Sequence, residues 1–153
     1  MEFSQFLQAV EPHHQGFVDA IREELFARGY RCKIELKATG LFASYSHPKT
    51  KRSLLNIFFR KTGMKFRVYP SVVSADIIKN LPTSMEKEIE KAMPCKRLLN
   101  SADCNPKCIM GYSFDLQGKR QVKCRYNCFE FAVTEESKPI IAKWIMEELD
   151  NER

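Results

Sequence analysis

Five of the six cysteines in this sequence lie between Cys95 and Cys128. Four of them form two C-x3-C pairs, Cys104 with Cys108 and Cys124 with Cys128, and 15 residues separate the pairs. Structural zinc sites need four ligands at tetrahedral corners, and cysteine thiolates are suited to that role. The pattern therefore predicts a cysteine cluster that binds zinc or responds to redox conditions, although buried thiols that only pack the fold would also fit.

A hairpin is predicted inside this segment, because apolar and polar residues alternate over 112–116 and again over 122–126. We expect a three-residue loop, Gly118–Arg120, since this loop keeps the apolar residues of both strands on one face. In this register Cys124 lies opposite Phe114 and faces the core.

Strand geometry then limits which thiols can meet. Cys128 follows Cys124 by four residues, or about 13 Å in an extended strand, whereas zinc ligands lie about 2.3 Å from the ion. The two share a metal only if the chain bends between them. We expect Cys104, Cys108 and Cys128 to gather at the open end of the hairpin, with Cys95 or Cys124 as the fourth member.

The remaining cysteine and the histidines suggest less chemistry. Cys32 alternates with apolar neighbours in a predicted strand, so we expect it in the core. His13 and His14 are adjacent in the first turn of a predicted helix and should point about 100° apart, which predicts surface positions and no joint site. Nothing in the sequence brings His47 to a thiol, so a thiol-dependent enzyme is the third choice among the functions.

The cysteine segment also resembles a known group of sequences. Cys104-Asn-Pro-Lys-Cys-Ile-Met-Gly-Tyr-Ser-Phe, followed by Lys123-Cys-Arg-Tyr-Asn-Cys-Phe, is similar to a motif of small uncharacterised bacterial proteins. The likeness extends to Tyr45–Thr50 and Phe59–Lys61 and thus over most of the chain. The resemblance implies a single-domain cytoplasmic bacterial protein, and it implies no catalytic or binding residues.

Basic residues interleave with aromatic ones on several predicted strands, which suggests nucleic acid as an alternative partner. A basic strand face with nearby tyrosines can follow a phosphate backbone and stack bases. An ordinary solvated sheet face would have the same composition. The candidate contacts are Arg60, Lys65, Arg67, Lys123 and Arg125.

Composition and motifs exclude several classes of protein. The chain has 153 residues and a net charge of +6, which permits a polyanionic partner without requiring one. No run approaches the roughly 18 apolar residues of a membrane span, and we see no signal peptide, so we expect a cytoplasmic protein with reduced thiols and no membrane partner. Glycine-rich phosphate loops and nucleophile elbows are missing from the sequence.

Periodicity predicts one α+β domain over residues 1–153. Four strands in a meander are expected at 30–37, 41–46, 53–60 and 64–69, with helices at 12–28, 71–79, 84–93 and 137–150. The helices should pack mainly on one face of an antiparallel sheet that also includes the C-terminal hairpin. The function favoured by the sequence is a non-catalytic binding or regulatory module.

Overall fold

The computed structural model describes residues 2–151 and has an α+β architecture, as the sequence predicts. A five-stranded antiparallel sheet has the order β1-β2-β3-β4-β7, and β5 and β6 form a separate two-stranded sheet. The elements in chain order are α1 (Phe3–Ala9), α2 (Pro12–Ala27), β1 (Arg31–Lys37), β2 (Gly40–Ser46), β3 (Ser53–Arg60), β4 (Gly63–Val68), α3 (Ala75–Lys79), α4 (Thr83–Lys91), α5 (Lys96–Leu99), β5 (Tyr112–Leu116), β6 (Lys119–Lys123), β7 (Glu130–Ala132) and α6 (Lys138–Asn151).

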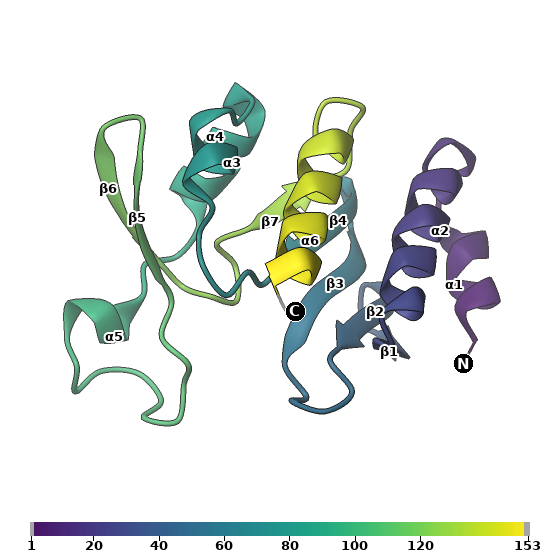
Figure 1. The fold of residues 1–153 in the computed structure, drawn as a ribbon, viewed down its shortest axis with the longest axis horizontal. Coiled ribbons are helices and arrows are strands. Elements are labelled where there is room, and N and C mark those ends of the chain that lie inside the picture. The colour runs from purple at the N-terminus through teal and green to yellow at the C-terminus, as the bar shows by residue number, and fades with distance from the viewer. Residues whose placement is uncertain (1, 152–153) are drawn as a thin grey trace.

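The longer helices cover one face of the five-stranded sheet (Figure 1). Helix α2 begins with Pro12, whose missing N–H is not needed in a first turn, and it stops before Gly29, which adopts a φ of +80°. Helix α6 contributes Trp144, which is 1% exposed and lies 4.5 Å from the ring of Phe129 between centroids. Among residues 2–151, no helix has the length and apolar character needed to cross a membrane.

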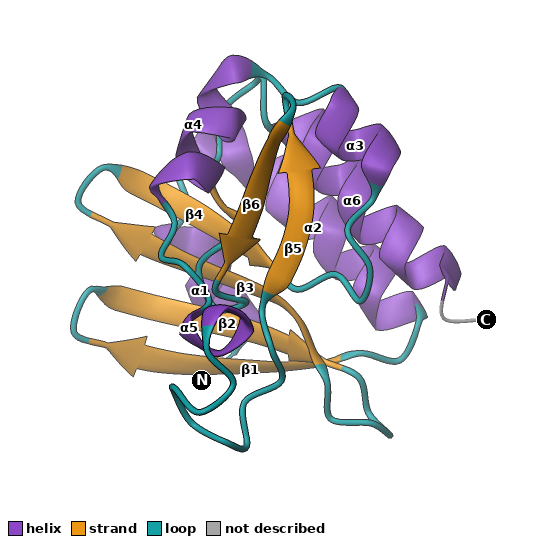
Figure 2. Ribbon diagram, turned by 90° about the vertical axis from the view of Figure 1, so that its left-hand side faces the viewer, coloured by secondary structure: helices purple, strands orange, loops and turns teal. Residues whose placement is uncertain are grey.

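The hairpin β5–β6 docks on the rest of the molecule through aromatic side chains. Tyr112 and Phe114 lie 4.9 Å and 5.6 Å from Phe129, and all three belong to the same buried cluster as the sheet and helices. Figure 2 shows the hairpin standing in front of the helices, with α5 and a long loop at the end away from its turn. The cysteine segment is thus attached to the core by the hairpin.

The expected three-residue hairpin loop is wrong. Only Gln117 and Gly118 connect the strands, with φ angles of 50° and 77°, and Phe114 lies opposite Gln121. A two-residue turn with two positive φ angles matches the right-handed twist of the flanking strands, which explains why it is preferred. Strand β6 ends at Lys123, and Cys124 lies beyond it and is half-buried, so the expectation that Cys124 lies opposite Phe114 and faces the core is also wrong.

Burial on the meander follows the prediction in the centre of the sheet and departs from it at the edge. Phe66 and Val68 of β4 are 0% exposed, which fits the alternation of apolar and charged residues over 64–69. Cys32, however, is exposed, and Leu36 on the same strand is 71% exposed. Strand β1 is the edge of the sheet, so Cys32 has a strand neighbour on one side only and lines an open groove beside Phe3.

Candidate functional site

The cysteine segment leaves the core and returns to it at two neighbouring points. An antiparallel bridge joins them, with hydrogen bonds from Cys95 N to Val122 O (3.2 Å) and from Cys124 N to Met93 O (2.8 Å). Residues two apart on a strand share a face, so Cys95 and Cys124 are diagonal neighbours on the same side of this bridge. Cys95 and Cys124 are therefore on the same side of the chain, about 7–8 Å apart as diagonal neighbours, where the segment begins and ends.

Arg97 holds a third cysteine close to this pair. It lies in α5, two residues after Cys95, and its Nη1 donates to the carbonyl oxygens of Pro106 and Cys108, both at 2.8 Å. A turn between Asn105 and Cys108, with a backbone hydrogen bond of 3.0 Å, sets the local path of this loop. The Cys104–Cys108 loop is thereby fastened to the helix that follows Cys95.

Arg125 holds the same loop from the other side. It follows Cys124, and its Nε donates to the carbonyl oxygens of Ile109 (3.3 Å) and Met110 (3.0 Å). Its Nη1 also donates to the hydroxyl of Tyr112 at 2.9 Å. One arginine from each end of the segment thus fixes the backbone around Cys108.

The electrostatics of Cys108 identify the thiols that lie close enough to act on it. Burial raises the pKa of the Cys108 thiol, and the neighbouring thiols of Cys104, Cys124 and Cys95 raise it further, because adjacent thiolates repel. The charge of Arg97 acts in the opposite direction. Cys95, Cys104, Cys108 and Cys124 are hereafter called the four-thiol cluster.

Cys128 is not among the thiols that act on Cys108, and the one thiol that acts on Cys128 itself is Cys124. That Cys128 joins Cys104 and Cys108 stays a prediction. The chain does bend after Cys124, through a hydrogen bond of 2.9 Å from Cys128 N to Cys124 O. The bend turns Cys128 into the core, where it is 0% exposed beside Phe129. Burial raises the pKa of the Cys128 thiol strongly, which favours the neutral form of an ordinary packing residue.

Gly111 provides a donor and a close approach at the cluster. Its N–H donates to the Sγ of Cys95 at 3.3 Å. A Cβ at Gly111 would lie 2.0 Å from the carbonyl oxygen of Lys123 and 2.9 Å from the Cβ of Cys95. Glycine is therefore required here for the loop to reach the bridge.

The donor set suits zinc, although the thiols stand wider apart than in a metal-bound cluster. Sulfurs around a tetrahedral zinc lie about 3.8 Å from one another, given a zinc–sulfur distance of about 2.3 Å. Within residues 2–151, no three cysteine sulfurs lie within 4.8 Å of one another. Binding would therefore require the exposed Cys104 and the half-buried Cys108 to move inward.

One other group of potential ligands is close together, at the start of α2. Ligand atoms of Glu11, His13 and His14 lie within 4.8 Å of one another, and His14 is 8% exposed, so the expectation of two separate surface histidines is wrong. Lys138 donates to the carbonyl oxygen of His13 at 3.1 Å, and burial, followed by the charges of His13 and Lys138, lowers the pKa of His14. A lysine and a helix N-terminus both disfavour a bound cation, so this group is a weaker metal site than the thiols.

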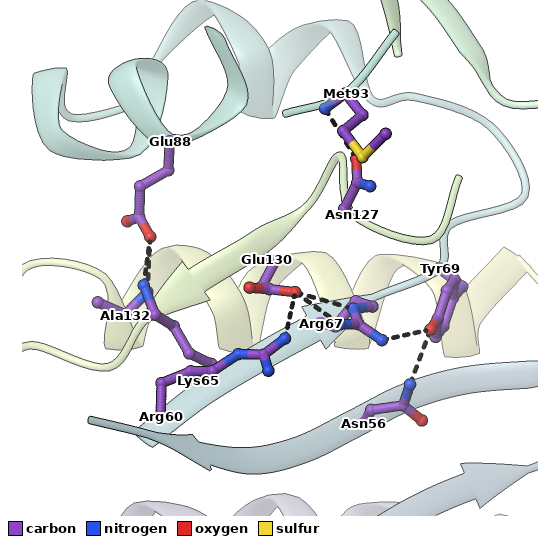
Figure 3. Close-up of polar contacts among 10 residues, drawn as sticks. All are labelled: Asn56, Arg60, Lys65, Arg67, Tyr69, Glu88, Met93, Asn127, Glu130 and Ala132. Atoms are coloured by element: carbon purple, nitrogen blue, oxygen red, sulfur yellow. Dashed lines mark hydrogen bonds and ion pairs between the residues drawn. The ribbon is translucent and has the colours of Figure 1, made fainter. Parts of the chain in front are cut away.

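The basic residues of β3 and β4 are paired with carboxylates within the fold (Figure 3). Arg67 contacts Glu130 at 2.6 Å and the hydroxyl of Tyr69 at 3.4 Å, and Arg60 reaches the same carboxylate at 3.9 Å. Lys65 pairs with Glu88 at 3.1 Å.

The two basic residues after the hairpin are also engaged. Lys123 Nζ donates to the carbonyl oxygens of Glu90 (2.9 Å) and Ala92 (3.0 Å) at the end of α4, and Arg125 binds the cysteine loop. These contacts give no support to a nucleic-acid surface made by the strands.

His47 has a structural role in its loop. Its Nδ1 accepts hydrogen bonds from the backbone N–H groups of Lys49 and Thr50, both at 3.2 Å. Its ring also meets Tyr30 edge to face, with 5.5 Å between centroids. Because Nδ1 already accepts two donors, the geometry gives no support to His47 as the base of a thiol nucleophile.

Comparisons with protein-family models, curated proteins and solved structures give no match. The site must therefore be interpreted from its own geometry. Sequence reasoning found the cysteine segment but missed Arg97 and Gly111, which organise it. A glycine directly before a strand, and an arginine two residues after a cysteine, were the signals that could have found them.

Proposed function

We propose that this protein is a non-catalytic binding or regulatory module that holds a zinc ion through the four-thiol cluster. The observation that supports the proposal is that three other thiols lie close enough to act on Cys108, whose backbone Arg97 and Arg125 hold in place. A zinc ion with four protein ligands has no open position for a substrate, which argues for a structural or regulatory role. In a reducing compartment, such as the bacterial cytoplasm that the sequence suggests, these thiols would be free to bind it.

Metal binding would have a simple consequence for this chain. Zinc binds thiolates, so the ligands must lose their protons, and the raised pKa of Cys108 makes this harder at low pH. Zinc affinity should therefore increase as the pH rises. Since the ligands come from both ends of the segment and from its loop, binding would cross-link all three.

A redox role is the second candidate, and one local feature favours it. Cys104 is exposed, and the backbone hydrogen bond from Cys108 N to Asn105 O curves the chain between Cys104 and Cys108. A disulfide between them would release two protons and two electrons to an oxidant such as a glutathione disulfide. This form and the zinc form exclude each other, because both use the same thiolates.

Elemental analysis of protein purified under reducing conditions, without a metal-binding tag, tests the zinc proposal. We expect one zinc per chain and a lower melting temperature after chelation. Cys108→Ser and Cys124→Ser should lose the metal. The exposed Cys32→Ser is the matched control and should keep it.

Cys128→Ser separates the four-thiol cluster from the alternative set. It should keep zinc while losing stability, because it places a hydroxyl in the core. Loss of zinc from Cys128→Ser with retention in Cys124→Ser would contradict the proposed ligands. A metal-free protein whose stability ignores added zinc would contradict the metal site altogether.

A further inference from the structure

A groove of about 680 Å³ lies between the loop after β2 and the returning end of the cysteine segment. Lys51 and Arg52 line it on the loop side, and Ile109, Arg125 and Tyr126 line it on the other. Its volume falls within the range of about 300–1,000 Å³ that is usual for small-molecule sites. None of the functions considered so far uses this groove.

The groove presents an aromatic surface. Tyr69 is 5% exposed and fixed in the core, and Tyr126 packs against it at a centroid distance of 6.1 Å and an interplanar angle of 66°. Tyr126 itself remains 50% exposed. A half-exposed tyrosine braced by a buried one offers a flat surface on which a planar ring can stack.

The groove also carries an excess of positive charge. Three cationic side chains line it, and one of them, Arg52, pairs with the buried carboxylate of Glu148 at 2.9 Å. The hydrogen-bond partners of Arg125 are carbonyl oxygens and a tyrosine hydroxyl, so its charge has no carboxylate among them. Lys51 is exposed and extends the positive charge to the rim.

The cationic side of the groove is held in place before any ligand arrives. His47 accepts two backbone N–H groups of its loop, and Lys51 adopts a φ of 63° as part of the same turn. The Nη2 of Arg52 donates to the carbonyl oxygen of Tyr69 at 2.8 Å, which joins the loop to the aromatic side. A fixed site of this kind loses little conformational freedom when it binds.

We propose that this groove binds a mononucleotide, with the base stacked on Tyr126 and the phosphate facing Lys51 and Arg52. A planar ring beside an anionic phosphate matches the aromatic surface and the cations, and the volume suits one nucleotide. The basic residues that would continue such a site along β3 and β4 are paired with Glu88 and Glu130, which argues against a longer single strand of nucleic acid as the ligand.

The proposal goes beyond the zinc site and needs no metal for its chemistry. Ile109 directly follows Cys108, and Arg125 directly follows Cys124, so the residues next to two of the thiols form one wall of the groove. Binding is therefore measured on both the zinc-loaded and the chelated protein. The metal content of each sample is determined separately.

Titration calorimetry with the full chain and AMP, GMP, CMP or UMP tests the proposal. We expect at least one to bind with a Kd below about 1 mM, and to bind more weakly as salt rises from about 50 to 200 mM. Tyr126→Ala and Lys51→Ser should each weaken binding at least about fivefold, whereas Tyr126→Phe should retain it. Lys119→Ser, at the exposed tip of the hairpin, is the charge-matched control and should change nothing.

Three results would overturn the proposal. The first is no binding of any mononucleotide near about 1 mM in either form of the protein. The second is inorganic phosphate binding as well as the nucleotide, so that the base adds nothing. The third is a single-stranded oligonucleotide binding much more tightly than the mononucleotide. If the protein as purified contains no zinc and still binds the nucleotide, the result supports the nucleotide proposal and contradicts only the proposed metal site.

Discussion

The guanidinium of Arg125 lies over the ring of Tyr112, with 4.5 Å between Cζ and the ring centroid, and its Nη1 donates to the hydroxyl of the same residue. That hydroxyl donates in turn to the carbonyl oxygen of Pro70 at 2.8 Å, and burial raises the pKa of Tyr112 strongly. Arg125 thus joins the cysteine loop, the hairpin and the segment after β4. A residue that sequence analysis suggested for nucleic-acid binding is a structural cross-link in the fold.

Replacing Arg125 with alanine should therefore destabilise the protein. We expect a loss of about 2 kcal/mol in the free energy of unfolding, from several hydrogen bonds to a charged donor and one cation–π contact. Arg125→Lys should recover only part of this, because an ammonium group cannot reach the same spread of acceptors. Urea denaturation measures both changes.

Arg120→Ala is the control for this experiment. Arg120 forms an exposed pair with Asp115 at 3.3 Å, and such pairs contribute little. Its change should stay within about 0.5 kcal/mol. Equal effects of the two alanine variants would mean that Arg125 is an ordinary surface arginine.

The ion pairs of β4 lead to a prediction about nucleic acid. Replacing Lys65, Arg67, Lys123 and Arg125 together with serine should unfold or strongly destabilise the protein, because each side chain holds an internal acceptor. Circular dichroism would detect the loss. A folded quadruple variant that no longer shifts a DNA or RNA probe at low salt would instead restore the nucleic-acid hypothesis.

Two glycines should respond in opposite directions to substitution by alanine. Gly111→Ala places a methyl group 2.0 Å from the carbonyl oxygen of Lys123, so the bridge must open, at a cost of about 1–3 kcal/mol. Gly16 lies inside α2, and no neighbouring side chain comes within 4 Å of the point where an added methyl group would sit, so Gly16→Ala should stabilise by up to about 1 kcal/mol. Thermal melts of both variants give the signs, and two destabilised variants would contradict the assigned packing.

Phe66 tests the assignment of the sheet faces. Phe66→Ala should cost about 3–5 kcal/mol, because the side chain is fully buried and its removal leaves a cavity. Leu36→Ala on the edge strand should change stability by less than about 0.5 kcal/mol. Similar losses at both positions would show that the edge of the sheet is covered in solution.

His14 should make stability depend on pH. Burial is the first cause that lowers its pKa below 6.5, followed by the charges of His13 and Lys138, while Glu11 and Glu135 oppose the shift. As the pH drops below 6.5, the unfolded chain binds a proton at His14 that the folded state does not yet bind. The free energy of unfolding therefore decreases with falling pH until the pH is below the lowered pKa of the folded state. Above pH 6.5 this contribution is constant.

Melting temperatures between about pH 8 and pH 5 test this dependence. His14→Phe should flatten the curve in that window, because it removes the titrating group. His13→Gln should keep most of the slope, since burial of His14 is the larger cause. A slope unchanged in His14→Phe would assign the effect to another group.

The meander could be predicted because its signals are local. Strand β3 has the expected bounds, Ser53–Arg60, and turn glycines such as Gly63 occupy positive φ where the sequence puts the chain reversal. Elements of three or four residues, such as α5 and β7, show no periodicity and were missed. Exposure of Cys32 depends on which strand forms the sheet edge, and that is a property of the whole fold.

The candidate site was only partly predictable for the same reason. The spacing of the cysteines identified the segment, but the hairpin register depended on Gln117 adopting a φ that is uncommon for its residue type. The position of Cys128 in the core depends on a bend after β6, and that of Cys108 depends on Arg97, which contacts residues about ten positions away. No local pattern contains that information.

The antiparallel bridge between Pro94 and Lys123 also bears on how the chain can fold. Strand β7 must pair with β4 across the long segment between them, and about half of that segment is the loop from Cys95 to Cys124 that the bridge closes. Closing this loop roughly halves the effective length of the segment, which lowers the entropic cost of bringing β7 to β4 by about 0.6 kcal/mol. A metal ion or a disulfide that joined thiols near this bridge would therefore speed the pairing of β7 with β4, which completes the main sheet.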